Sequence, residues 1–188
     1  DVEITLHEMT TMEQIAALKE GRIDVGFGRI RYEDPSVRRI VLRDERLMAA
    51  LSVDHPLAQQ QPLTLGDLLD ETLILYPQAP RPSFADQVLA AFHDRGMTPE
   101  KITEVRELQV ALGLVAAGEG ITLVPECLHS LQRQDVVYCP LNEQALVSPI
   151  ILSTRLLDES PDIRTLLAMV YEQYQGEGIA HLKPGESA

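Results

Sequence analysis

The sequence has few positive charges. Its 16 Lys and Arg residues stand against 29 Asp and Glu, so the formal net charge is −13. Proteins that bind nucleic acid draw most of their affinity from Lys and Arg on phosphate groups, and this balance excludes DNA binding by this segment alone. The sequence also lacks a signal peptide, and it contains no apolar run long enough to cross a membrane. Because its first residue is Asp1, we expect a segment of a longer protein.

Motifs for metal, nucleotide and nucleophile chemistry are absent too. Cys127 and Cys139 show no CxxC pattern, which favours structural thiols over the alternatives of a metal site or a disulfide. The pairs of glycines at 26–28 and 118–120 do not complete a G-x-G-x-x-G fingerprint, and no G-x-S-x-G motif occurs. The five histidines have no metal-ligand spacing; they are His7, His55, His93, His129 and His181. We therefore predict neither a cofactor nor a metal.

The N-terminal part predicts a strand, a helix and a second strand. Residues 2–8 alternate apolar and polar side chains, which is typical of a strand. Thr10 and Glu13 have the spacing of a capping box, and Gly21 stops the helix that follows. Residues 23–27 form the next strand. This order of elements indicates a parallel sheet.

Two long strands divide the chain. Residues 40–53 are unusually long for one strand and carry charged side chains in the middle, and residues 147–154 return. We interpret both as crossings between two Rossmann-like α/β lobes, residues 1–44 with 149–188 and residues 45–148. Hinged small-molecule receptors have this architecture, and their ligand lies in the cleft at the carboxyl ends of the strands.

The remaining elements follow from local patterns. In the run 107–125, Leu108, Leu112 and Val115 share one helical face that starts at Glu107, and a buried strand follows at 121–124. A second helix runs from Ser83 to Gly96. Further strands are predicted at 72–76, 101–105 and 135–139, an amphipathic helix at 163–174, and a loose tail from Gly176.

Three features could bind a small anion. The turn at Thr10 and Thr11 offers hydroxyls and open N–H groups at the positive end of a helix. The segment 80–84 places a proline-stiffened loop before a second capped helix. Arg29 follows a strand end and can reach into a cleft. Two helix starts facing each other would suit a small dicarboxylate, recognised by close donors because the net charge repels anions at long range.

Each of these residues also has a plainer interpretation. Thr10, Thr11 and Ser83 can be ordinary helix caps. Arg29 can be a solvated surface charge, and Phe84 can be a core residue. Glu107 can be only a partner of the helix dipole. From the residues alone, both interpretations stay open.

The chain resembles the effector-binding domain of LysR-type transcriptional regulators, within them the muconate-responsive activators of catechol and benzoate degradation. The resemblance covers nearly the whole chain and weakens after Tyr174. Its matching segments are 8–9, 17–29, 42–43, 45–48, 75–77, Pro82 with Phe84, and 104–125. The broad family shows in the runs 18–28 and 116–121, and the subgroup in 104–125 and in Pro82 with Phe84.

The resemblance implies a type-2 periplasmic-binding-protein-like fold, a cytoplasmic regulator rather than an enzyme, and cis,cis-muconate as effector. The residues that line or support the effector cleft would be Thr11, Arg29, Pro82, Ser83, Phe84 and Glu107. It also implies a dimer or tetramer, DNA contact only through an N-terminal winged helix-turn-helix, and a first strand and helix preceding Asp1. The alternatives are an exported solute-binding protein for a small carboxylate and an enzyme acting on a small carboxylic acid.

Overall fold

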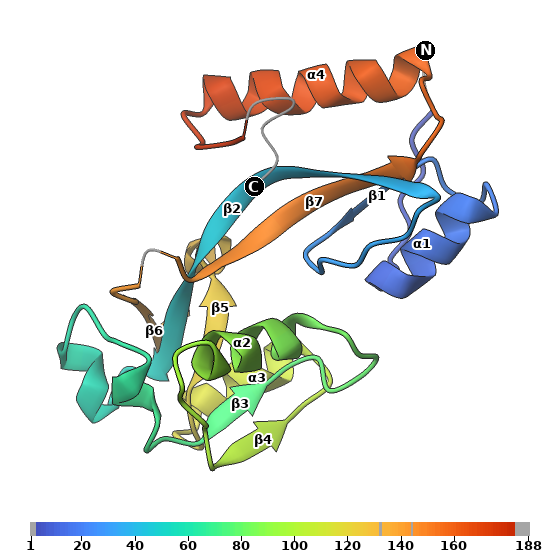
Figure 1. Cartoon of the computed structure of the whole chain (residues 1–188). Coiled ribbons are helices and arrows are strands. Elements are labelled where there is room, and N and C mark those ends of the chain that lie inside the picture. The colour runs from blue at the N-terminus through green and yellow to red at the C-terminus, as the bar shows by residue number, and fades with distance from the viewer. Residues whose placement is uncertain (1–2, 132, 144, 183–188) are drawn as a thin grey trace. The chain divides into compact units, whose positions relative to one another are not determined.

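A computed structural model describes residues 3–131, 133–143 and 145–182. Figure 1 shows the elements in chain order from blue to red. The helices and strands are α1 (Thr11–Lys19), β1 (Val25–Gly28), β2 (Val37–Ser52), β3 (Leu73–Leu75), α2 (Phe84–His93), β4 (Ile102–Glu104), α3 (Leu108–Ala116), β5 (Thr122–Pro125), β6 (Val136–Pro140), β7 (Val147–Arg155) and α4 (Pro161–Gly176). Short 3-10 turns lie at Pro56–Gln59, Gly66–Leu68 and Glu126–Ser130.

The chain divides into two compact units. Unit 1 consists of Asp1–Asp44 and Pro149–Ala188, and unit 2 consists of Glu45–Ser148. The long strands β2 and β7 are both predicted by the sequence, and each contributes residues to both units.

Unit 1 is built on three strands in the order β1, β7, β2. β1 pairs antiparallel with β7, from Val25 opposite Thr154 to Gly28 opposite Ile151. α1 buries Ile15 and Leu18 against Val37 at the start of β2. The predicted helix and its capping box are confirmed. The parallel pairing expected for the following strand is wrong, because β1 pairs antiparallel with β7, which comes from the end of the chain.

The strand predicted at residues 2–8 is also wrong for its described part. Residues 3–8 adopt no strand, and Val2 lies outside the described residues. Ile4 is 75% exposed and Leu6 is 90% exposed. An alternating pattern becomes a strand only when a neighbouring strand takes its backbone hydrogen bonds and a core takes its apolar face. In the described part of the chain, residues 3–8 have neither.

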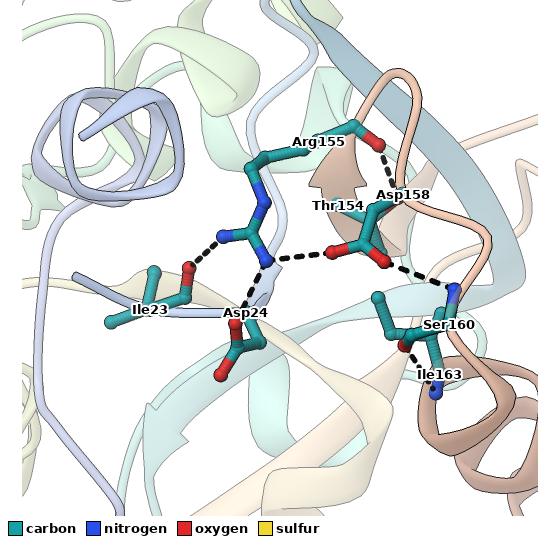
Figure 2. Close-up of polar contacts among 7 residues, drawn as sticks. All are labelled: Ile23, Asp24, Thr154, Arg155, Asp158, Ser160 and Ile163. Carbon is teal, nitrogen blue, oxygen red and sulfur yellow. Dashed lines mark hydrogen bonds and ion pairs between the residues drawn. The ribbon is translucent and has the colours of Figure 1, made fainter. Parts of the chain in front are cut away.

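Arg155, at the end of β7, joins three segments of unit 1 (Figure 2). Its Nη1 donates to the Ile23 carbonyl at 2.7 Å, and its Nη2 donates to Asp24 at 2.8 Å and to Asp158 at 2.6 Å. Asp158 in turn accepts the Ser160 N–H at 3.1 Å. Since Ser160 is the N-cap of α4, this guanidinium connects the entry to β1, the end of β7 and the start of the last helix.

α4 runs over the parts of β2 and β7 that belong to unit 1 (Figure 1). Arg43 of β2 lies over the ring of Tyr174, 5.3 Å from its centroid. The predicted loose tail is wrong for residues 177–182, which fold back. The Leu182 N–H donates to the Leu42 carbonyl at 2.9 Å, and the His181 ring lies 5.6 Å from Tyr171 and 5.7 Å from Tyr174. Residues 183–188 lie outside the described residues.

Unit 2 surrounds the large apolar core of the molecule. The second half of β2 pairs antiparallel with β5 and with β6. β3 pairs parallel with β4, and α2 and α3 bury their apolar faces against this framework. The predicted helices from Ser83 and from Glu107 are confirmed. The core is dominated by apolar side chains from the strands and both helices, including Leu51, Leu73, Ile74, Val88, Phe92, Leu112, Val115 and Ile121.

Gly120 lets two strands of unit 2 approach each other. A Cβ at this position would lie 2.4 Å from the Thr72 carbonyl oxygen and 3.1 Å from the Thr72 Cβ. The Ile121 N–H donates to the same Thr72 carbonyl at 2.9 Å. A side chain at position 120 would therefore push apart the backbone contact that brings β5 next to β3.

Candidate functional site

At the start of α1, the N-cap residue donates hydrogen bonds to a carboxylate of the same helix, that of Glu13. Thr10 is the N-cap, and its N–H and hydroxyl donate to Glu13 Oε2 at 2.7 and 2.8 Å. The backbone hydrogen bond from Thr10, followed by the one from its hydroxyl, holds the pKa of Glu13 below its ordinary value. Thr10 therefore acts as a cap. Thr11 is the first helical residue, in the turn whose N–H groups have no acceptor within the helix.

Two glycines of β1 allow the start of α1 to come close. A Cβ at Gly28 would lie 3.2 Å from the hydroxyl of Thr11, and one at Gly26 would lie 2.5 Å from Gln14 Oε1. Gln14 donates to the Phe27 carbonyl at 2.8 Å and to the Met9 carbonyl at 3.2 Å. Sequence reasoning missed Gln14. The spaced glycines were the available signal, because they mark a close approach to a strand.

Arg29 directly follows β1, one residue beyond Gly28. The residue is half-buried, and its Nη1 atom is buried. It is therefore not a fully solvated surface charge. Its position next to Gly28 places it at the same end of β1 as the Thr11 hydroxyl.

The start of α2 is more deeply buried than that of α1. Ser83 is 5% exposed and Phe84 is 8% exposed, whereas Pro82 before them is exposed. The Ser83 hydroxyl donates to the Pro77 carbonyl at 3.2 Å, and the Ser83 N–H donates to Asp86 Oδ2 at 2.6 Å. The Phe84 ring lies 5.3 Å from that of Tyr76. Phe84 thus belongs to the core of unit 2, and Ser83 fixes the loop that enters the helix.

Glu107 occupies the N-cap position of α3. Its backbone is extended, it is exposed, and its side chain makes no capping hydrogen bond. The carboxylate therefore stands at the positive end of the helix without closing it.

The candidate residues fall into two groups. Thr11 and Arg29 belong to unit 1, and Pro82, Ser83, Phe84 and Glu107 belong to unit 2. Within unit 1, the Thr11 hydroxyl lies close to Gly28, and Arg29 follows Gly28 in the chain. Within unit 2, three residues are contiguous at the start of α2, and Glu107 starts the neighbouring helix.

Residues 3–131, 133–143 and 145–182 show few features of metal binding, membrane spanning or thiol chemistry. No cluster of three or more His, Cys, Asp or Glu could hold a metal ion there. No helix in these ranges is long and apolar enough to span a membrane. Cys127 is exposed and Cys139 is buried, and these two cysteines form no disulfide. Burial raises the pKa of Cys139, which lowers its reactivity.

Known proteins match this chain closely. The model of the LysR substrate binding domain matches residues 1–175. The transcriptional regulator BenM of Acinetobacter baylyi is 47% identical over 181 residues, which are 95% of this chain and 60% of BenM. CatR of Pseudomonas putida is 49% identical over 173 residues, covering 92% of this chain and 60% of CatR. The chain thus spans about 60% of the length of these curated relatives.

A solved structure supports the same assignment. The BenM effector-binding domain with its effector benzoate superposes with a TM-score of 0.89 at 45% identity, covering 97% of this chain and 82% of that one. The predicted periplasmic-binding-protein-like α/β fold is thereby confirmed. The relatives are named as transcriptional regulators and not as enzymes. The chain belongs to the LysR substrate-binding domain family.

Proposed function

We propose that this chain is the effector-sensing domain of a cytoplasmic LysR-type activator of catechol and benzoate degradation genes, and that it binds cis,cis-muconate. The start of α2 carries the proposal. There, an exposed Pro82 precedes a buried N-cap, Ser83, and the first helical turn. DNA is bound by an N-terminal winged helix-turn-helix outside this chain, since a net charge of −13 does not favour phosphate contacts.

In unit 2, the N–H groups of Phe84 and Ala85 belong to the first turn of α2, which has no intrahelical acceptor. Together with the helix dipole they form the donor set that a carboxylate prefers. Phe84 supplies the apolar surface beside it. Glu107, at the start of α3, supports this group of residues.

In unit 1, the first turn of α1 at Thr11 and the guanidinium of Arg29 supply the second donor set. A charge-assisted hydrogen bond from Arg to a carboxylate is stronger than a neutral one. Muconate has two carboxylates, and each donor set is suited to bind one carboxylate. A monocarboxylate such as benzoate, the effector named for BenM, would use only one of them.

Titration calorimetry with cis,cis-muconate, benzoate and an unrelated amino acid tests the proposal. We expect heat with muconate, and weaker binding when either Thr11→Val or Ser83→Ala is introduced. Heat with the amino acid and none with muconate would overturn the proposed effector. If only one of the two variants affects binding, only the donor set of that variant belongs to the effector site.

A further inference from the structure

The loop 77–83, between β3 and α2, has few backbone donors of its own. Pro77, Pro80 and Pro82 carry no N–H group. Gln78 fastens the loop to the end of β4 by donating its N–H to the Val105 carbonyl at 2.8 Å. A loop of this composition depends on side chains for its conformation, and this loop determines where Ser83 and the start of α2 lie.

Arg81 supplies those side-chain contacts. Its Nε donates to the Gln78 carbonyl at 3.0 Å, which closes the loop on itself. Its Nη1 donates to Asp86 Oδ1, in the first turn of α2, at 2.7 Å. Its Nη2 donates to Glu104, the last residue of β4. One planar guanidinium therefore joins the loop, the helix and the strand.

Asp86 connects Arg81 to Ser83 through the two oxygens of its carboxylate. The carboxylate accepts Arg81 on Oδ1 and the Ser83 N–H on Oδ2, at 2.7 and 2.6 Å. The Ser83 hydroxyl returns to the start of the loop at the Pro77 carbonyl. The N-cap of α2 is thus held through a chain of contacts that begins at Arg81.

Arg81 also offsets two negative charges near the proposed carboxylate site. Without its cation, Asp86 and Glu104 would stand uncompensated beside the start of α2 and would repel an anionic ligand. The side chain of Arg81 is 30% exposed, so its ion pairs contribute little to the stability of the fold.

We infer that Arg81 is the positioning residue for the effector half-site of unit 2. It touches no ligand itself. Its three-way contact holds the loop 77–83 so that Ser83 and Phe84 present the first turn of α2 to a carboxylate. This inference rests on the proposed function, and it adds the residue that keeps that half-site in its binding conformation.

Two measurements on Arg81→Gln test the inference. The dissociation constant for cis,cis-muconate should rise about tenfold, the scale of losing a residue that orients a binding group. Amide exchange at Ser83 should accelerate in the unliganded protein, because Asp86 loses the partner that orients it. Arg81→Lys should restore only part of the affinity, since an ammonium keeps the charge but not the planar fork.

Arg106→Gln is the matched control. It removes one exposed cation next to Glu107 and should leave the affinity within about twofold and the Ser83 exchange unchanged. Full recovery with Arg81→Lys would show that charge alone matters and would overturn the positioning role, as would unchanged Ser83 exchange in Arg81→Gln. If the unmodified chain binds no muconate, the proposed effector is wrong, and the Ser83 exchange still decides whether Arg81 holds the loop.

Discussion

Arg155 and Asp158 form a 2.6 Å ion pair that links the end of β7 to the turn before α4. Replacing Arg155 with Ala breaks this pair and the contacts to Ile23 and Asp24 together. We expect the free energy of unfolding to fall by about 1–2 kcal/mol, because hydrogen bonds to charged groups are lost at a partly exposed site. Chemical denaturation measures the change. Arg164→Ala, at an exposed position on α4, should alter stability by less than about 0.5 kcal/mol.

The stability of unit 1 should decline in acid through Asp158. The hydrogen bond from the Ser160 N–H holds the pKa of this carboxyl below its ordinary value; burial opposes it, and Arg155 lowers the pKa further. A lowered folded-state pKa contributes stability above the unfolded value of about 3.9, and this contribution is lost as the pH falls through the folded pKa. Asp158→Asn should therefore lower stability at pH 6 and show a flatter decline below pH 4. Asp70→Asn, at an exposed site, should follow the parent protein at both values. A parallel decline in the parent and in Asp158→Asn would refute the linkage.

Arg29→Ala should weaken effector binding more than it weakens folding. A charge-assisted hydrogen bond to a carboxylate is worth roughly 1.5–3 kcal/mol, so the dissociation constant for muconate should rise at least tenfold. The melting temperature without ligand should move little. Arg22→Ala removes an exposed Arg that pairs with Glu20 and should change neither quantity. A sharp fall in melting temperature with unchanged affinity would make Arg29 structural.

Two glycines should respond in opposite directions to Ala. At Gly120 the new methyl group would meet the Thr72 carbonyl at 2.4 Å, and the overpacking should cost about 1–3 kcal/mol. At Gly113, inside α3, the methyl group would meet nothing within 4 Å, and the higher helix propensity of Ala should add up to about 1 kcal/mol. Thermal or denaturant unfolding of both variants is the measurement. Equal effects at the two positions would contradict the close approach of β5 to β3.

The chain should self-associate. Residues 3–8 belong to no helix or strand, and their apolar side chains Ile4 and Leu6 are largely exposed. Such a segment offers backbone donors and apolar surface to another chain. Light scattering should give a mass above 20.9 kDa, and the combined change Ile4→Ser and Leu6→Ser should reduce it. A clean monomer of the parent protein over the micromolar range would rule this out.

Local patterns predicted the helices and the long strands well. The capping box of Thr10 and Glu13, the apolar faces of α2 and α3, and the length of β2 each follow from a few neighbouring residues. Partner choice between strands did not follow, since β1 pairs with a strand more than 120 residues away. The strand expected at residues 2–8 failed for the same reason, because its formation depends on a neighbour and not on its own alternation.

The candidate site was predicted in part. Capping residues and apolar spacing predict the helix starts at Thr11, Ser83 and Glu107. The burial of Ser83 and Phe84 depends on long-range packing. The spaced glycines of β1 hint at a close neighbour such as Gln14, whereas the contacts of Arg81 depend on side-chain geometry that no sequence pattern encodes. In the sequence Arg81 is a single charged residue between prolines, and only the structure shows its three hydrogen-bond partners.

The discontinuity of unit 1 sets an order for folding during synthesis. Unit 2 is one continuous segment, 45–148, so its core can form as soon as the ribosome has released those residues. Unit 1 must wait for β7 and α4, because β1 has no partner strand until β7 is made. Until then residues 3–44 remain attached to a folded neighbour without a sheet of their own. The N-terminal segment is therefore the part of this domain that nascent-chain chaperones would meet longest.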